Sequence, residues 1–413
     1  MNNRVCVFTS VHPPLDHRIF YKECKSLARA GYGVTIIAPH DRPEVVNGIR
    51  IVPLPRPKRR VSRIFRTGWQ LYRKALAEEA AVYHFHDPEL IWVGLLLRCH
   101  RKKVVYDIHE DVPQDLLHKF YIPLWLRWPL SWMASTVESI AARFLSGLIV
   151  VTPSIAERFK EHSSKVVLVR NFPVPEEFPP HLEIAWSQRD NAVIFVGSMS
   201  RNRGIRELVE AIGLVPEHLN SRLRLLGPFS MPNLLSELER VPGWDRVENL
   251  GTQDREGVIR SLSRVRAGLV TIHPVPQLTV SYPIKMFEYM AACVPIIASD
   301  FPTWRQFIME ARCGLLVNPL NPREISDAIE YILTHPKEAE EMGRNGRKAM
   351  ETSFNWTHDE RKLLAFYRGL SAPPPRQAPP GFGSAMASKH PSFAVTKPAD
   401  RTWFDSDQPS AGQ

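Results

Sequence analysis

The sequence predicts an α/β protein with two doubly wound parallel sheets, one after the other along the chain. Three observations support this fold class. Short apolar strands alternate with helical stretches in the first part of the chain, a proline-rich segment then interrupts them, and a second alternating series follows. Alternation of this kind is typical of parallel sheets, because a crossover helix must return the chain to the end where the next strand begins. We therefore expect two domains with a cleft between them.

The first series begins with a strand, a helix and a second strand. Val5–Thr9 is a short apolar run, 19–30 has amphipathic spacing and ends before Gly31, and Val34–Ala38 is apolar again. Together these elements predict a βαβ unit. Further apolar runs predict the remaining strands of this domain at 82–85, 104–108, 148–152 and 166–169.

The second series follows the segment 171–180, which has four prolines in ten residues and interrupts the pattern. Apolar runs predict strands at 192–196, 223–226, 247–250, 267–271 and 295–299, with helices at 205–212 and 255–261 between them. Further helical patterns occur at 322–334, 336–351 and 357–370.

These patterns predict the limits of the domains. We expect a first domain at 1–172, a linker at 173–190, a second domain at 191–353, a terminal helix at 354–370 and a tail at 371–413. The tail is rich in Pro, Ser, Gly and Ala and lacks periodicity, so it is predicted to be disordered.

Composition excludes a wholly disordered or collagen-like protein. The 413 residues are 44% hydrophobic and 23% charged, as in a folded protein, and the net charge of +10 favours anionic partners. No long apolar run and no signal-peptide pattern occur, so a cytoplasmic location is expected. The five cysteines are scattered, and neither metal-ligand spacing nor an Asp-x-Asp pair is found. We therefore predict no cofactor and no required metal.

The segment 282–300 carries the strongest functional signal. Tyr282, Pro283 and Ile284 lead into a helix whose free N–H groups suit a phosphate. Glu288 lies less than two turns further along, where its carboxylate can reach ribose hydroxyls. Apolar residues surround it on nearly every side, which argues against a solvent-facing glutamate. Lys285 is either an anion contact at the helix start or a solvated lysine.

The loop after the strand 192–196 is small and basic. Gly197 allows a ligand close to the backbone, and Ser198 and Arg201 follow it. Arg203 stands at the mouth of the next helix, where a guanidinium can hold phosphate oxygens in bidentate fashion. The alternative interpretation is a solvated turn whose arginines face water.

Polar residues also follow strands of the first domain. His109 comes after 104–108, at the strand end where ligands bind in open α/β sheets. It could hydrogen-bond a sugar hydroxyl or shield a developing charge; alternatively, it caps the next helix together with its acidic neighbours. For Asp87, the preferred interpretation is a helix N-cap before Pro88.

The loop after the first strand contains Asp16 and Arg18. It has no Gly-x-Gly-x-x-Gly, which argues against a nicotinamide enzyme. We expect Asp16 and Arg18 to face an acceptor across the cleft instead.

Two segments suggest contact with a membrane. The run 56–66 is densely basic, and 120–132 is rich in aromatic residues. Together they could hold the protein on an anionic membrane surface; the alternative is a solvated loop and a partly buried helix. No nucleic-acid partner is expected, because no nucleic-acid-binding signature accompanies the basic run.

These segments together resemble a glycosyltransferase of the GT-B fold, similar to the retaining family 4 enzymes that build bacterial polysaccharide and lipopolysaccharide. The resemblance covers roughly residues 4–370. It is carried by 9–38 with its Asp16-His17-Arg18-Ile19-Phe20 core, 85–90, 105–111, 151–154, 169–171, 196–208, 283–300 and 313–315. It implies two Rossmann-like domains facing each other across a cleft, with a terminal helix that crosses back onto the first domain.

The resemblance also implies roles for three residues. Glu288 would bind the ribose of a nucleotide-sugar donor, and His109 would lie near the transferred sugar. Arg203, at the position where the family usually has Lys before Gly, would hold the diphosphate. These three residues are the expected catalytic set.

The chain departs from the family at two positions. Ser198 stands where the family often has Arg, which leaves Arg203, with Arg201 or Lys285, to neutralise the phosphates. Val280 stands where the family often has a second Glu, so backbone N–H groups around 279–282 would contact the donor sugar.

The expected function is therefore transfer of a sugar, with retention, from a nucleotide-diphosphate sugar to a lipid-linked or glycan acceptor. Such an enzyme, of the hexosyltransferase type, would act in cell-surface glycan biosynthesis, peripherally at the inner face of the plasma membrane. The alternatives are a nucleotide-sugar epimerase or phosphorylase with the same fold, and a non-catalytic scaffold that binds nucleotide sugars at the membrane.

Overall fold

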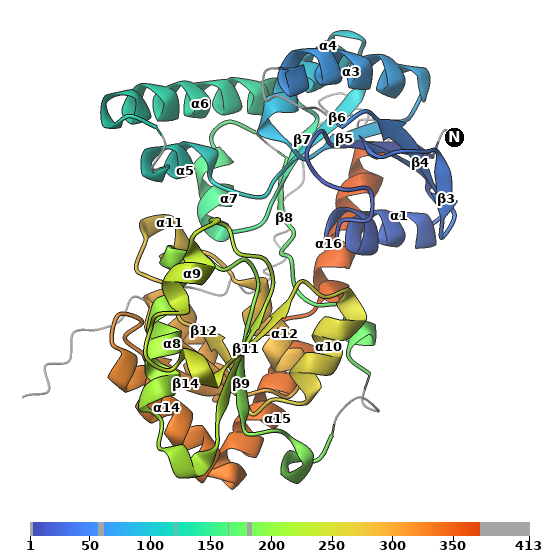
Figure 1. The fold of residues 1–413 in the computed structure, drawn as a ribbon. Coiled ribbons are helices and arrows are strands. Elements are labelled where there is room, and N and C mark those ends of the chain that lie inside the picture. The colour runs from blue at the N-terminus through green and yellow to red at the C-terminus, as the bar shows by residue number, and fades with distance from the viewer. Residues whose placement is uncertain (1–2, 57–61, 120–121, 164, 180–183, 372–413) are drawn as a thin grey trace, which may run out of the picture. The chain divides into compact units, whose positions relative to one another are not determined.

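The computed structural model describes residues 3–56, 62–119, 122–163, 165–179 and 184–371. It contains two sheets, each flanked by helices (Figure 1). The predicted tail lies outside the described residues except for Ser371. The same holds for 57–61 of the basic run and for residues 120 and 121 of the aromatic segment.

The first sheet is parallel except at one edge. Its strands are β1 Arg4–Phe8, β2 Gly33–Pro39, β3 Glu44–Val46, β4 Ile49–Leu54, β5 Val82–Phe85, β6 Lys103–Ile108, β7 Gly147–Val150 and β8 Val166–Leu168, in the order β3-β4-β2-β1-β5-β6-β7-β8. Only β3 and β4 are antiparallel, around Asn47 and Gly48 at positive φ. The sequence pattern missed both strands, because β3 is very short and prolines at 53 and 55 interrupt the pattern near β4.

Two helices of the first domain begin with a π-helical segment, and one of these segments is Arg63–Thr67, directly before α3. The predicted helix at 19–30 begins as a π-helical turn, Ile19–Cys24, and continues as α1, Lys25–Arg29. The other helices are α3 Gly68–Ala77, α4 Ile91–Cys99, α5 Val112–His118, α6 Leu124–Phe144 and α7 Pro153–Phe159.

The second sheet is entirely parallel within the described part of the chain. Its strands are β9 Ala192–Val196, β10 Arg222–Leu226, β11 Val247–Gly251, β12 Ala267–Val270, β13 Ile296–Ser299 and β14 Gly314–Val317, in the order β11-β10-β9-β12-β13-β14. Its helices are α8 Ile205–Leu214, α9 Leu234–Leu238, α10 Arg255–Ser263, α11 Pro276–Thr279, α12 Ile284–Ala291, α13 Pro302–Ala311, α14 Pro322–Thr334 and α15 Pro336–Thr352. The last described helix is α16, Trp356–Ser371.

The strand order reverses once in each sheet. In the first, β1 lies between β2 and β5; in the second, β9 lies between β10 and β12. Ligands of open parallel sheets bind beyond the carboxyl ends of the strands at such a reversal, because the loops on its two sides diverge there. Two binding positions are thereby defined, one on each sheet.

Helix α12 lies unusually close to the second sheet. Gly268 on β12 faces the Tyr289 ring of α12, and a side chain at that position would overlap the ring. The Tyr289 hydroxyl accepts a hydrogen bond from the backbone N–H of Val196 at 3.1 Å. The absence of a side chain at Gly268 and the hydrogen bond of the Tyr289 hydroxyl together set the distance between α12 and the second sheet. They thereby also set the position of Glu288.

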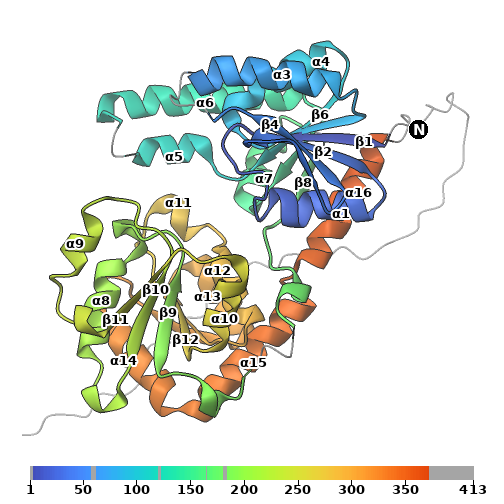
Figure 2. The same cartoon turned by 45° about the vertical axis from the view of Figure 1, so that its right-hand side comes forward.

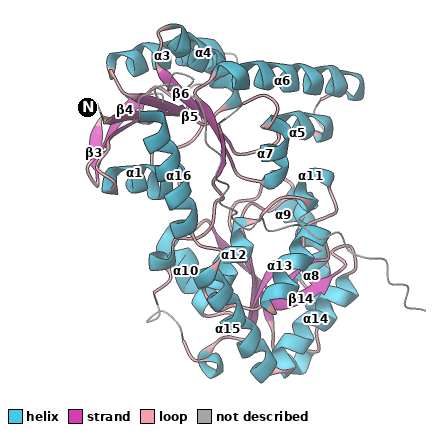
Figure 3. Ribbon diagram, turned by 180° about the vertical axis from the view of Figure 1, so that it is seen from behind, coloured by secondary structure: helices cyan, strands magenta, loops and turns pink. Residues whose placement is uncertain are grey.

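Helix α16 packs on the first sheet although it follows the second in sequence. Figure 2 and Figure 3 show it running beside α1. The Trp356 indole donates a hydrogen bond to the Ser26 hydroxyl at 2.9 Å, and Leu363 and Tyr367 are buried in the core beneath the sheet. The packing of α16 therefore completes the first core.

The segment before β9 is packed on the second domain. Phe172 and Phe178 are buried in its core, where the Phe172 ring contacts Phe287 edge to face at 4.6 Å.

Among the described helices, none is long and apolar enough to cross a membrane.

Candidate active site

A cavity of about 880 Å³ opens at the carboxyl ends of both sheets. The second domain contributes the loop after β9 and the start of α12; the first contributes the loop after β6 and the starts of α5 and α7. The predicted site residues that line it are Gly197, Ser198, Arg203, Tyr282, Pro283, Ile284, Lys285, Glu288 and His109. Residues predicted from separate segments are thus brought to one cavity.

Glu288 has a partner that the sequence did not reveal. Its Oε1 accepts a hydrogen bond from the Nη1 of Arg255 at 2.5 Å, and the carboxylate is almost completely buried. Arg255 also contacts Glu177 Oε2 at 2.6 and 2.9 Å. The ion pair fixes the orientation of the Glu288 carboxylate at the cavity wall.

Lys285 is buried, and no hydrogen bond joins its amine to any of the described residues. Its Nζ lies 3.5 Å from the centre of the Phe195 ring and close to Gly197, where an added Cβ would meet it at 3.3 Å. Burial, with the nearby charge of Arg203, lowers the pKa of this amine well below its usual range, despite the opposing charge of Glu288. Lys285 is therefore not a solvated lysine but a buried amine with unsatisfied hydrogen-bond donors at the cavity.

Arg203 is the second cation without a partner in the cavity. Among the described residues, no hydrogen bond or ion pair is made by its guanidinium, and burial lowers its pKa although Glu110 across the cavity acts in the opposite sense. Arg203 reaches this place because Gly204, at a φ of 68°, packs against the Thr271 carbonyl with no room for a side chain. An anion between Arg203 and Lys285 would satisfy both groups.

The opposite wall is acidic. Glu110, Asp111 and Asp115 line it beside His109. Burial, together with a hydrogen bond and the charge of Glu110, raises the pKa of Asp115 to about 7. The cavity is thus polarised, with unpaired cations on the second domain and carboxyl groups on the first.

His109 occupies the cavity wall as its position at a strand end predicts, and it does not cap the next helix. Its Nε2 lies 3.1 Å from His86 Nδ1 and 3.4 Å from Asp107 Oδ2. The cap of α5 is Asp111, which accepts from the Gln114 N–H at 3.4 Å.

Three predicted site residues lie elsewhere. Arg201 points away from the cavity and pairs with Glu237 at 2.7 and 2.8 Å, because it stands at the outer side of the turn before α8. Arg18 is buried and binds both oxygens of Asp107 at 2.9 to 3.1 Å. Neither Arg201, predicted as a donor contact, nor Arg18, predicted as an acceptor contact, lines the cavity.

Asp16 and Asp87 stabilise loops. Asp16 Oδ1 accepts from the backbone N–H groups of Arg18 and Ile19, so it caps the first helical turn and does not line the cavity. Asp87 precedes Pro88 as expected, yet its side chain accepts from the Ser10 N–H at 2.6 Å and not from its own helix. Asp87 therefore occupies the predicted N-cap position, but its side chain binds the loop after β1 instead of capping the helical turn.

Sequence reasoning missed Arg255 and the neighbours of His109. Arg255 begins α10 directly after the carboxyl end of β11, a position comparable to that of Arg203 after β9, so the same positional rule could have identified it. The partners His86 and Asp107 could not be assigned, because their contacts depend on strand order.

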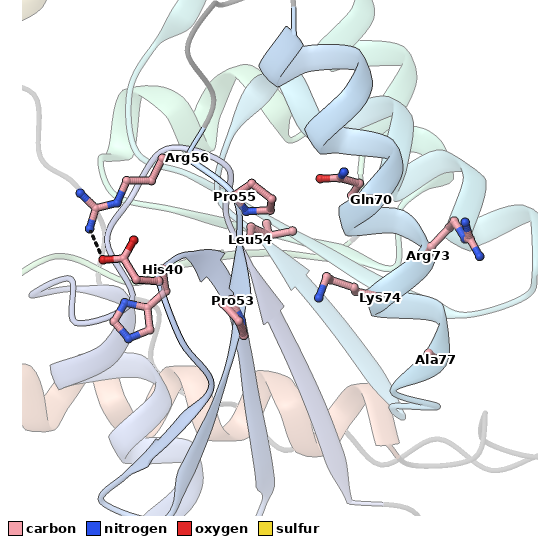
Figure 4. Close-up of a pocket in the computed structure, with 10 residues that line it drawn as sticks. His40, Pro53, Leu54, Pro55, Arg56, Gln70, Arg73, Lys74 and Ala77 are labelled. Atoms are coloured by element: carbon pink, nitrogen blue, oxygen red, sulfur yellow. Dashed lines mark hydrogen bonds and ion pairs between the residues drawn. The ribbon is translucent and has the colours of Figure 1, made fainter.

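A second cavity, of about 810 Å³, lies at the carboxyl ends of β2 and β4 against α3 (Figure 4). Basic side chains of Arg56, Arg73 and Lys74 line it, and Arg56 pairs with the exposed Asp41 at 3.4 Å. None of the predicted site residues belongs to it. The first cavity is therefore the candidate active site.

Comparison with protein families matches the two sheets separately. Residues 18–175 match the model of Glycosyltransferase Family 4, and 181–349 match that of Glycosyl transferases group 1. The D-rhamnosyltransferase WbpZ of Pseudomonas aeruginosa is 24% identical over 287 residues, covering 68% of this chain and 71% of that protein. An uncharacterised glycosyltransferase of Methanocaldococcus jannaschii is 23% identical and covers 88% of this chain and 98% of its own.

Solved structures share the fold over most of the chain. Sucrose-phosphate synthase of Thermosynechococcus elongatus has a TM-score of 0.71 at 20% identity, covering 89% of this chain and 99% of its own. WaaG, a glycosyltransferase involved in lipopolysaccharide biosynthesis, has a TM-score of 0.68 at 16% identity, covering 88% and 99%. HepE of Anabaena, in complex with UDP and glucose, has a TM-score of 0.67 at 13% identity, covering 89% and 99%. These likenesses concern the fold.

Proposed function

We propose that this chain, which is a glycosyltransferase with the GT-B fold, transfers a sugar from a nucleotide-diphosphate sugar to a lipid-linked or glycan acceptor. The observation that carries the proposal is the pair of basic side chains, Arg203 and Lys285, that have no partner among the described residues and lie at the strand reversal of the second sheet. A diphosphate there would compensate both. The complex of HepE with UDP is consistent with such a donor.

The donor is proposed to bind along the second domain. Arg203 and the N-terminus of α12 hold the diphosphate, and the Lys285 amine takes up a proton when the anion arrives. Arg255 holds Oε1 of Glu288, which leaves Oε2 for a ribose hydroxyl. As the glycosidic bond breaks, charge grows on the departing diphosphate, so these fixed cations stabilise the transition state more than the ground state.

The transferred sugar would then lie against His109 on the first domain. We propose retention at the anomeric carbon on the resemblance to family 4. No metal or cofactor is proposed, because Arg203 and Lys285 can supply the positive charge that a divalent ion would bring to the diphosphate. Backbone groups at 279–282 would contact the sugar where Val280 replaces an acidic residue.

Membrane attachment is proposed to occur through α6. This helix buries Glu138, Ala141 and Ala142 on one side and exposes apolar side chains on the other: Leu124, Trp125, Trp128, Trp132, Met133, Val137, Ile140 and Phe144. An exposed stripe rich in tryptophan suits the interface of a bilayer, and the net charge of +10 favours anionic lipid. A lipid-linked acceptor at the inner face of the plasma membrane fits this arrangement, as does a role in surface-glycan synthesis like that of WaaG, a glycosyltransferase involved in lipopolysaccharide biosynthesis.

Release of nucleoside diphosphate tests the proposal. Purified protein with an acceptor lipid is incubated with a panel of UDP-, GDP- and ADP-sugars, with and without EDTA. Arg203→Ala and Glu288→Gln should each lower release by about 100-fold, because each removes a fixed group from the developing charge or from donor binding. Arg201→Ala is the matched control, since this arginine lies two positions away and pairs with Glu237 outside the cavity.

Several outcomes would contradict the proposal. Absence of diphosphate release from every donor would exclude transfer, and equal effects of the Arg203 and Arg201 substitutions would exclude the proposed diphosphate site. Conversion of a donor without diphosphate release would indicate an epimerase. Tight donor binding without any turnover would indicate a scaffold, and loss of activity with EDTA would contradict the metal-free proposal.

A further inference from the structure

A cluster of buried polar side chains lies directly behind His109. It contains Arg18 and Glu23 from the first helical segment, His84 and His86 from β5 and the residue after it, and Asp107 from β6. Each is at most 4% exposed. Three sequence segments that looked unrelated, around 16–23, 84–87 and 107–109, therefore meet at one point in the first domain.

The guanidinium of Arg18 lies between the two carboxyl groups of the cluster. Arg18 binds both oxygens of Asp107, while burial and the nearby Asp107 charge raise the pKa of the Glu23 carboxyl well above its usual range. Burial also lowers the pKa of His84 and that of His86, so both rings are neutral. The positive charge of Arg18 thus balances the negative charge of Asp107.

This arrangement does not favour a metal ion. Ligand atoms of Glu23, His84, His86 and Asp107 lie within 4.8 Å of one another, a grouping that their sequence spacing does not reveal. However, Arg18 Nε is 2.9 Å from Glu23 Oε1, and its Nη2 is 2.9 Å from Asp107 Oδ2. A divalent ion would place two more positive charges beside a guanidinium that already neutralises the site.

The cluster reaches the cavity at His109, which contacts both His86 and Asp107. His86 Nδ1 lies 3.1 Å from His109 Nε2, and Asp107 Oδ2 lies 3.5 Å from the first and 3.4 Å from the second. A histidine whose one ring nitrogen is held in this way has a fixed tautomer and a fixed ring plane. The other nitrogen of His109, Nδ1, is then the one available to a ligand.

We propose that His86 is a positioning residue for sugar transfer: it binds Nε2 of His109 and thereby presents Nδ1 of His109 to the donor sugar. This inference rests on the proposed function, in which His109 lies beside that sugar. The opposite end of the cluster is anchored by α16, where the Tyr367 hydroxyl lies 2.8 Å from His84 Nδ1, and the His84 and His86 rings are 4.5 Å apart.

Substitutions at position 86 separate positioning from packing. In His86→Asn the amide places a polar atom near the former Nδ1, in His86→Gln near the former Nε2, and His86→Leu provides neither. Because a displacement of about 1 Å can cost about 100-fold in rate, we expect His86→Leu and His86→Gln to lower kcat by up to about 100-fold with little change in KM. The kcat of His86→Asn should be at least about tenfold higher than that of His86→Leu.

Two comparisons make this test specific. His100 forms a matched pair with Tyr72 in the same domain, at 2.8 Å and away from the cavity, so His100→Gln should leave kcat unchanged. In a His109→Leu background, His86→Leu should cause no further loss, because the contact through which it acts is gone. Equal losses for all three substitutions at 86, or an additive double variant, would overturn the proposal in favour of a packing role.

A second measurement does not depend on turnover. In the full chain with ¹⁵N-labelled histidine, the ring nitrogens of His109 should report one tautomer in the wild type and in His86→Asn. They should report a mixture in His86→Leu. A mixture in the wild type would contradict the proposed contact. If the wild type released no diphosphate yet showed the single tautomer, the proposed function would fail while the contact would stand.

Discussion

At the residue scale, Lys285 stands out because it is buried without a hydrogen bond. An unsatisfied buried donor costs about 1–3 kcal/mol, and proteins retain such a cost where a ligand compensates it. The nearby Phe195 ring can offset part of the charge but accepts no conventional hydrogen bond. In the proposed function, the bound anion would compensate this cost, which destabilises the protein in the absence of a ligand.

Replacing Lys285 by Met should raise the free energy of unfolding by about 1–3 kcal/mol and weaken nucleoside-diphosphate binding by at least about tenfold. In the wild type the unfolded chain protonates this amine below about pH 10.4, whereas the folded chain, whose pKa is lowered, protonates it only at lower pH. Between these two pKa values the unfolded state binds more protons, so stability should rise with pH from the lowered pKa toward about 10. The Met variant should lack this part of the slope.

Urea denaturation across this pH range and calorimetric titration with nucleoside diphosphates would measure both effects. Lys348→Met, at an exposed position on α15, is the control and should change neither quantity. A Lys285→Met protein that is less stable than the wild type, or that binds diphosphate equally well, would contradict this role.

At the element scale, α12 and α8 position the cationic wall because glycines let them lie close to neighbouring strands. Gly268 makes room for Tyr289 of α12, and Gly204 makes room for the Thr271 carbonyl at the start of α8. These close approaches place Glu288 and Arg203 at the same edge of the second sheet. The site is therefore built by backbone packing before any ligand contact.

Helix α6 offers a test of membrane attachment. Changing Trp125, Trp128 and Trp132 together to Ser should lower binding to vesicles containing anionic phospholipid by at least about tenfold, because each tryptophan is at least 70% exposed and provides apolar area for the bilayer interface. Sedimentation with vesicles measures this binding, which should also weaken as salt rises.

The control substitutes Trp69, an exposed tryptophan on α3, by Ser. That change should leave vesicle binding nearly intact. Unchanged binding of the triple α6 variant would exclude this helix as the attachment surface. Equal binding to neutral and anionic vesicles would exclude the electrostatic part of the proposal.

At the scale of the whole molecule, one carboxylate connects the two domains. Glu177 lies between them in sequence and contacts His17 of the first domain at 3.5 Å and Arg255 of the second at 2.6 Å. Burial alone would raise its pKa, but the hydrogen bond from His17 and the charge of Arg255 lower it to about 2. Arg255 also binds Glu288. The contacts of Glu177 with His17 and Arg255 therefore couple the orientation of the Glu288 carboxylate to the segment between the domains.

Glu177→Gln should lower the free energy of unfolding at pH 7 by on the order of 2 kcal/mol. A carboxyl with a depressed folded pKa stabilises the protein above its unfolded pKa of about 4.3 and loses that contribution as pH falls toward 2. The difference between wild type and variant should therefore shrink between about pH 4.3 and pH 2.

Urea denaturation at a series of pH values measures this difference. Glu176→Gln is the adjacent control, because the Glu176 side chain is exposed and a similar loss is not expected. A difference between wild type and Glu177→Gln that stays constant down to pH 3 would show that the carboxylate charge plays no part.

Much of the fold followed from local pattern. Strands such as Val82–Phe85 and Ala192–Val196, and the helix Pro322–Thr334, have the bounds expected from their apolar spacing. Edge strands such as β3 were missed, because pairing with a neighbour, and not their own composition, makes them strands. Glu288, Arg203 and Lys285 could be identified because each stands at a loop or helix start near the end of a strand.

The sequence by itself determined two parallel-sheet domains, their order and the strand ends at which a ligand binds, because periodicity and position along an element are local properties. Tertiary structure alone decided which polar groups meet. It joined Arg18 to Asp107 across 89 positions and Arg255 to Glu288 across 33, and it buried the Lys285 amine without a partner. Such pairings depend on strand order and on the close packing of helices against the sheet, which no single segment encodes.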